Sequence, residues 1–174
     1  MNGDGEDVTI RRLETAIGGL LLSATDAGLV HVGFDVEGED AVRERLEREV
    51  GPVVTGSNGT LDDAARQIEE YLSGARRRFD VPLDTRLARG FRGEVQRRLA
   101  EVGYGATVTY SGLAELAGRP AAVRAVGTAC ATNPLPLLWP CHRVLRSDGG
   151  LGGYRGGTGV KVALLELEAA HRTA

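Results

Sequence analysis

The stretch NPLPLLWPCHRV, residues 133–144, is the most unusual part of the 174-residue chain. It holds three prolines in seven residues, and proline fixes φ and removes an amide donor, so we expect a stiff, extended segment outside regular sheet. The segment delivers Cys141 next to His142 and Arg143. Positive charge near a thiol lowers its pKa and favours the nucleophilic thiolate, so Cys141 is a candidate nucleophile. The alternative is a small buried Cys141 beside a surface histidine.

The stretch that follows, residues 147–159, contains seven glycines in thirteen residues. Glycine permits positive φ and close approach of the backbone to a ligand. The spacing matches neither a phosphate-binding loop nor the dinucleotide fingerprint. Two interpretations stay open, a flexible surface loop and a loop that folds over a flat ligand with Tyr154 as its stacking partner.

Two short helices before the proline-rich segment indicate a helix-turn-helix. Ser111 is placed to cap the first helix, Gly118 ends it, and an alanine-rich second helix follows over residues 121–132. Any pair of short helices with a glycine in the turn looks similar, so the pattern is compatible with DNA binding or with a plain helical hairpin. Cys130, inside the second helix, is interpreted as a small packing residue.

The rest of the chain shows alternating strand and helix patterns. In the first half we expect a hairpin around residues 26–28, helices over 39–50 and from a capping box at Thr60 to Gly74, a loop over 51–60 and a last strand over 76–83. His31 falls on the face of its strand that we expect to be exposed. In the second half we expect further helices over 91–102 and from Thr158 onward, and a short strand over 107–110.

Composition and charge exclude several classes of protein. With 42% hydrophobic and 26% charged residues the chain is typical of globular proteins, and two cysteines do not make a disulfide framework. No stretch is apolar over the length that a membrane span needs, and the acidic start is unlike a secretory signal, so we expect a cytoplasmic protein without membrane contact. Residues 1–85 carry 9 basic and 18 acidic side chains (net −9) and residues 86–174 carry 12 and 6 (net +6). This asymmetry is compatible with nucleic-acid contact by the second half or with pairing of the two halves.

The PCHRV sequence, with NPLPLLW before it and a Gly-Gly-Tyr-X-Gly-Gly loop after it, resembles the active-site signature of the O6-alkylguanine-DNA alkyltransferases. The similarity runs from about Phe91 through Tyr110 and Arg124 to Glu168. The first half, with IGGLLLSATDAGLVHVGF and QIEEYLSGARRRFDVPL, resembles the variable first domain of the same proteins. We therefore expect an α+β protein with a small N-terminal α/β support domain containing an antiparallel sheet (1–85). A mainly helical C-terminal domain (86–174) would hold the helix-turn-helix and the active-site loop.

The resemblance implies a single, irreversible transfer of a methyl or larger alkyl group to Cys141. The donor would be O6 of guanine, with O4 of thymine as an alternative, in double-stranded DNA. His142 would act as a base through a water, Glu168 would hold the imidazole, and Asn133 would brace the turn before the cysteine by side-chain hydrogen bonds. No cofactor is implied, and we expect a monomer.

The resemblance also implies how DNA would be bound. The damaged base must leave the stack, and Arg124 would fill the vacated space while Tyr110 would aid rotation and hydrogen-bond a guanine ring nitrogen. Small side chains would let the second helix lie close in the minor groove. The remaining expected DNA contacts are Ala121 and Ala125, with phosphate contacts by Arg119, Arg143 and Arg146. A structural role within the motif is the alternative for Arg143. The remaining expected pocket residues are Val144, Tyr154, Arg155 and Trp139.

Three features depart from the family pattern. Trp139 stands where an aliphatic residue is more common, and Arg155 where the side chain is often small. The stretch GFRGEVQRRL, residues 90–99, lacks the Phe-Gln pair that is common before the first helix of this domain. No cysteine precedes position 130, so a thiolate zinc site in the first domain is excluded and we expect no metal. Two other functions compete: a damage-sensing binder related to the alkyltransferase-like proteins, which lack the cysteine, and a thiol hydrolase using Cys141 and His142.

Overall fold

The computed structural model describes residues 6–172, which fall into two compact units that divide between Leu87 and Ala88. The α+β class expected from the sequence is confirmed. No helix within the described residues has both the length and the apolar character needed to cross a membrane.

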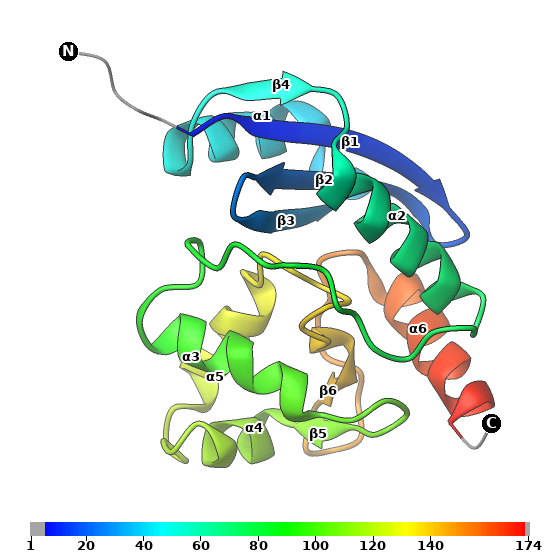
Figure 1. The fold of residues 1–174 in the computed structure, drawn as a ribbon. Helices are drawn as coiled ribbons and strands as arrows, with labels where there is room; N and C mark the ends of the chain where they lie inside the picture. The colour runs from blue at the N-terminus through cyan, green and yellow to red at the C-terminus, as the bar shows by residue number, and fades with distance from the viewer. Residues whose placement is uncertain (1–5, 173–174) are drawn as a thin grey trace. The chain divides into compact units, whose positions relative to one another are not determined.

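The first unit is a four-stranded sheet with two helices. The strand order is β3-β2-β1-β4, with antiparallel pairing throughout except for β4, which runs parallel to β1 (Figure 1). A core cluster joins the sheet to α1 through six buried side chains. The elements are β1 (Val8–Thr15), β2 (Gly18–Thr25), β3 (Gly28–Phe34), α1 (Glu39–Glu49), β4 (Val53–Thr55) and α2 (Gly59–Leu72). The cluster consists of Val8, Ile10, Leu21, Val30, Val42 and Leu46.

The expected hairpin and both expected helices of this unit are confirmed, but β1 was missed and β4 lies in the segment expected to be a loop. The strand expected over residues 76–83 is wrong, because only an isolated bridge between Leu29 and Leu83 forms there. Pro82 next to it has no N–H to offer a sheet ladder. Because β4 pairs in parallel with β1, the sheet is mixed rather than purely antiparallel.

Two local expectations in the first unit are also wrong. His31 is only 1% exposed, because all seven residues of β3 are buried and neither face of the strand is open to solvent. The cap of α2 is not Thr60 but Asn58, whose side-chain oxygen accepts a hydrogen bond from Leu61 N at 2.9 Å. With Asn58 as its cap, the helix begins at Gly59, one residue before Thr60.

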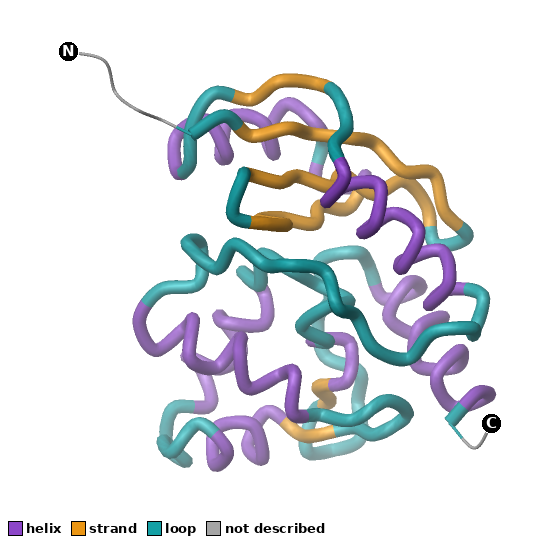
Figure 2. The backbone as a smooth tube through the Cα atoms, in the orientation of Figure 1, coloured by secondary structure: helices purple, strands orange, loops and turns teal. Residues whose placement is uncertain are grey.

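The second unit is mainly helical, and loops make up most of the chain between residues 132 and 157 (Figure 2). The helix expected over 91–102 is an α-helix that tightens into a 3₁₀ turn at its end. The α-helices are α3 (Gly90–Arg98), α4 (Tyr110–Leu116), α5 (Val123–Ala131) and α6 (Thr158–His171). The other elements are η2 (Leu99–Glu101), β5 (Val108–Thr109), η3 (Cys141–Arg143) and β6 (Val144–Leu145).

The expected helix-turn-helix consists of α4, a turn containing Gly118 at φ +75°, and α5. The N-terminal cap of α4 is Thr109 rather than Ser111, since the Thr109 hydroxyl accepts a hydrogen bond from Gly112 N at 3.0 Å. The short strands β5 and β6 pair in parallel, Val108 with Val144. This pairing holds the start of α4 beside the turn that carries Cys141, although the two segments are far apart in sequence.

Candidate active site

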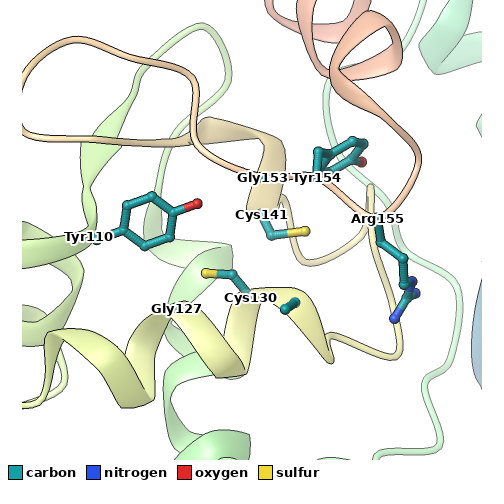
Figure 3. Close-up of a pocket in the computed structure, with 8 residues that line it drawn as sticks. Tyr110, Gly127, Cys130, Cys141, Gly153, Tyr154 and Arg155 are labelled. Carbon is teal, nitrogen blue, oxygen red and sulfur yellow. The ribbon is translucent and has the colours of Figure 1, made fainter.

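Cys141 is the first residue of η3 and is 6% exposed. Its backbone N–H donates to the Trp139 carbonyl at 2.8 Å, which fixes the tight turn that presents the thiol. The thiol borders a cavity of about 410 Å³ (Figure 3). The cavity is lined by Tyr110, Gly127, Cys130, Ala131, Cys141, Gly153, Tyr154 and Arg155.

The proline-rich segment before Cys141 is folded into bends and turns, so the expected extended conformation is wrong. Asn133 is responsible for much of this shape. Its buried side chain donates from Nδ2 to the Trp139 carbonyl at 2.8 Å and accepts at Oδ1 from Leu135 N at 3.1 Å. Leu137 inside the turn adopts φ +74°, an uncommon conformation for a residue with a side chain. The Nδ2 group of Asn133 thus supplies a donor in a segment whose prolines have none.

Behind Cys141, the buried carboxylate of Glu168 gathers several donors from distant parts of the unit. His142 Nε2 lies 2.8 Å from Glu168 Oε1, Arg143 donates from Nε (2.9 Å) and Nη2 (2.7 Å), and Gly105 N donates at 3.2 Å. The His142 and Glu168 side chains are 0% and 1% exposed, and that of Arg143 is 8% exposed. The predicted phosphate contact by Arg143 does not fit this burial, since its guanidinium is engaged by Glu168 and the Val102 carbonyl.

Burial sets the protonation of the groups around the cysteine. It lowers the pKa of His142, with help from the charges of Arg143 and Lys161, and Glu168 opposes this only in part. Burial also raises the pKa of the Cys141 thiol, against the opposing effects of the Asn133 side chain and of two nearby cations. At neutral pH the site therefore holds a neutral imidazole and a protonated thiol, so the thiol needs a base before it can react.

Two residues of the site were missed in the sequence. Lys161 is fully buried, and its Nζ donates to the carbonyls of Val144 (2.6 Å), Leu151 and Gly153, which ties the glycine loop to β6. The sequence contains a hint of its special role, because Lys161 is the only lysine and all other basic side chains apart from histidine are arginines. Cys130 lines the cavity rather than serving only as a packing residue, and burial raises its pKa to about 12.

Two tyrosines and the glycine loop meet at the cavity of Cys141. Tyr110 and Tyr154 line the cavity, and the Tyr154 ring lies edge-on to the His142 ring with centroids 6.5 Å apart. Burial raises the pKa of the Tyr110 phenol. A Cβ placed on Gly152 would lie 2.7 Å from Tyr110 Oη, so the glycine loop passes directly against this tyrosine.

Of the four residues predicted for the pocket, Tyr154 and Arg155 line the cavity, whereas Trp139 and Val144 do not. Trp139 and Val144 are buried in the unit, at 5% and 0% exposure, and neither is among the residues that line the cavity. Their contribution is through the backbone, since the Trp139 carbonyl accepts from Asn133 and the Val144 carbonyl accepts from Lys161.

The residues predicted to contact DNA, apart from the buried Arg143 and the half-buried Tyr110 of α4, are exposed on or near α5. Ala121, Arg124 and Ala125 are all exposed, and Arg124 borders an open groove of about 650 Å³ that also contains Tyr110 and Arg146. Arg119 is exposed as well, with its guanidinium carbon 4.7 Å from the centroid of the Phe91 ring. Tyr110 and Gly127 border both this groove and the cavity of Cys141.

The chain matches two family models over most of its length. Residues 10–85 match the ribonuclease-like domain, and residues 90–170 the DNA-binding domain, of 6-O-methylguanine DNA methyltransferase. A methylated-DNA–protein-cysteine methyltransferase of Methanosarcina barkeri is 38% identical over 156 residues, covering 90% of this chain and 94% of the relative.

Solved structures of a Mycobacterium tuberculosis protein agree with this match. Its O6-methylguanine methyltransferase superposes with a TM-score of 0.79 at 34% identity over 94% of both chains. A second structure, of the Mycobacterium tuberculosis protein OGT in complex with DNA, gives a TM-score of 0.79 at 32% identity over 95% of this chain and 94% of that chain. With both domain models matched and relatives similar over nearly its whole length, the chain belongs to the methylated-DNA–protein-cysteine methyltransferase family.

Proposed function

We propose that this protein repairs DNA by taking an alkyl group from O6 of guanine, or from O4 of thymine, onto Cys141. The observation that carries the proposal is the cysteine itself, which borders a cavity large enough for a base and is backed by the buried His142–Glu168 pair. In this family such a cysteine is alkylated once and is not regenerated. The damage-sensing alternative lacks support because its relatives have no cysteine at this position.

The chemistry follows from the protonation of the site. His142, neutral because it is buried, takes the thiol proton of Cys141 through a water, and Glu168 stabilises the imidazolium that forms. The sulfur attacks the alkyl carbon, an S–C bond forms, and the C–O6 bond breaks. The electron pair stays on guanine, where Tyr110 hydrogen-bonds a ring nitrogen as the charge develops. The departing base then takes up a proton from water, and His142 returns its proton to water. A thioether is a poor leaving group, so each chain acts once.

Access to the base requires it to leave the duplex, because the target atom cannot reach a sulfur inside a cavity while stacked. We assign Arg124 to the space that the flipped nucleotide vacates, and the small exposed side chains of α5 to close approach in the minor groove. We assign the phosphate contacts to Arg119 and Arg146. The net charge of +6 over residues 86–174 implies that DNA binding is sensitive to salt. Residues 1–85, with a net charge of −9, would be a support domain held off DNA by their charge.

We further infer a cytoplasmic monomer that needs no cofactor. The experiment for the whole proposal is a titration of a duplex carrying one O6-methylguanine with increasing protein. Lesion loss should equal the amount of protein added, Cys141→Ser should remove nothing, and Cys130→Ser should behave as the parent protein. Tight binding without lesion loss would favour a damage sensor instead. Many turnovers on an ester or amide would favour a thiol hydrolase.

A further inference from the structure

The open groove beside the cavity of Cys141 contains a carboxylate, that of Asp148. Among the described residues that line this groove, three carry a charge: Arg124, Arg146 and Asp148. The two arginines suit a surface that receives DNA. The carboxylate does not, because it repels the phosphates that the arginines would attract.

A tight turn fixes the position of Asp148. Arg146 N donates to the Gly150 carbonyl at 2.9 Å, and Gly149 N donates to the Arg146 carbonyl at 3.0 Å. Gly149 adopts φ +85°, which a residue with a side chain rarely does. Within this turn, Asp148 Oδ1 accepts a hydrogen bond from Gly150 N at 2.9 Å. The carboxylate is therefore held by the backbone of its own turn.

The second carboxylate oxygen of Asp148 is paired with Arg146. Asp148 Oδ2 lies 3.0 Å from Arg146 Nη2, and both side chains are 61% exposed. An ion pair so open to water contributes little to the stability of a fold. Arg146 can therefore exchange this carboxylate for another anion at small cost, while the turn keeps Asp148 in place.

We propose that Asp148 limits the affinity for duplex DNA by competing with DNA phosphates for Arg146. In the free protein the carboxylate neutralises the guanidinium. In the complex Arg146 binds a phosphate instead, and Asp148 stays nearby as a like charge. The consequence is a shorter stay on undamaged DNA, which a protein that searches for rare lesions requires. The inference rests on the proposed function, which assigns Arg146 to phosphate contact.

Asp148→Asn tests the charge alone, because the asparagine oxygen can still accept the hydrogen bond from Gly150 N. The Kd for a short undamaged duplex, measured by fluorescence anisotropy at low salt, should fall roughly three- to ten-fold. A plot of the logarithm of the binding constant against the logarithm of the salt concentration should steepen by about one, because one more phosphate is neutralised without a competing carboxylate.

Glu115→Gln is the matched control. Glu115 is exposed on α4 and is not among the residues that line the groove, so its loss removes the same charge elsewhere in the unit. The Kd of this variant should change less than about two-fold. Asp148→Ser replaces Asp148→Asn if the asparagine variant does not fold. Equal gains in Glu115→Gln and Asp148→Asn, or no gain in a folded Asp148 variant, would overturn the inference.

A double variant tests whether Asp148 acts through Arg146. Arg146→Met should weaken DNA binding and flatten the salt dependence by about one. In that background, Asp148→Asn should change the Kd less than about two-fold, because the partner for which it competes is gone. The same gain with and without the arginine would show that Asp148 does not compete for Arg146.

The repair assay separates this inference from the proposed function. If the parent protein binds duplex DNA but leaves O6-methylguanine in place, the proposed function fails, while the binding measurements still test Asp148. If the parent protein removes the methyl group and Asp148→Asn binds duplex DNA no more tightly, the inference about Asp148 alone is wrong.

Discussion

Replacing Glu168 by glutamine should destabilise the second unit strongly. The carboxylate is 1% exposed and receives the hydrogen bonds of His142, Arg143 and Gly105. Glutamine keeps the shape but removes the charge, and its NH₂ group would meet the donors of Arg143. Breaking a buried ion pair by removing one partner costs about 3–5 kcal/mol, which is a large part of the stability of a typical domain.

The assay is urea unfolding followed by the fluorescence of Trp139, the only tryptophan, which is buried in the same unit. Glu166→Gln, at an exposed position of the same helix, is the matched control and should change the free energy of unfolding by less than about 0.5 kcal/mol.

The double variant Glu168→Gln/Arg143→Met carries no isolated buried charge from this pair. It should be more stable than the sum of the single variants by about 1–3 kcal/mol. A loss below about 1 kcal/mol for Glu168→Gln, or strict additivity in the double variant, would refute the ion-pair reasoning.

Three further predictions concern reactivity. Burial holds the pKa of Cys141 above its ordinary value of 9.0, so the thiolate fraction, and with it the rate of iodoacetamide reaction, should rise about ten-fold per pH unit from about pH 7 to 9; a plateau in that range would indicate a lowered pKa. Gly152→Ala should slow alkyl transfer at least ~10-fold, because φ is +73° and the new Cβ would displace Tyr110, whereas Gly159→Ala should not; equal rates by mass spectrometry would contradict the contact. Arg124→Ala should lose most repair of duplex DNA but keep more reactivity toward free O6-benzylguanine, and equal losses on both substrates would argue against a role in base flipping.

The elements predicted correctly from the sequence are those whose local pattern agrees with their final environment. The hairpin, the helix-turn-helix and α6 each combine a clear period with a turn or breaker residue. Strand β1 was missed because its alternation is interrupted at Arg11 and Arg12, where two charged residues stand between buried Ile10 and Leu13. Arg12 is held there by Asp35 and Glu14, partners that a local pattern does not reveal.

In the candidate site, too, some residues can be identified from the local sequence and others only from contacts with distant residues. Its motif residues, Cys141, His142 and Tyr154, stand out by their neighbours in the chain. The burial of Arg143 depends on Glu168, which lies 25 residues further along and meets it only in the folded unit. Next to a catalytic motif in a basic half, an arginine is naturally interpreted as a DNA contact. Only tertiary structure distinguishes that arginine from Arg124, which is exposed.

The central claim is that Cys141 is the acceptor of a single alkyl group, and intact mass spectrometry with peptide mapping tests it most directly. After incubation with an excess of duplex carrying O6-methylguanine, each chain should gain the mass of one methyl group, located on Cys141 and absent from Cys130. An unchanged mass while the lesion disappears, or a methyl group on any other residue, would contradict the claim.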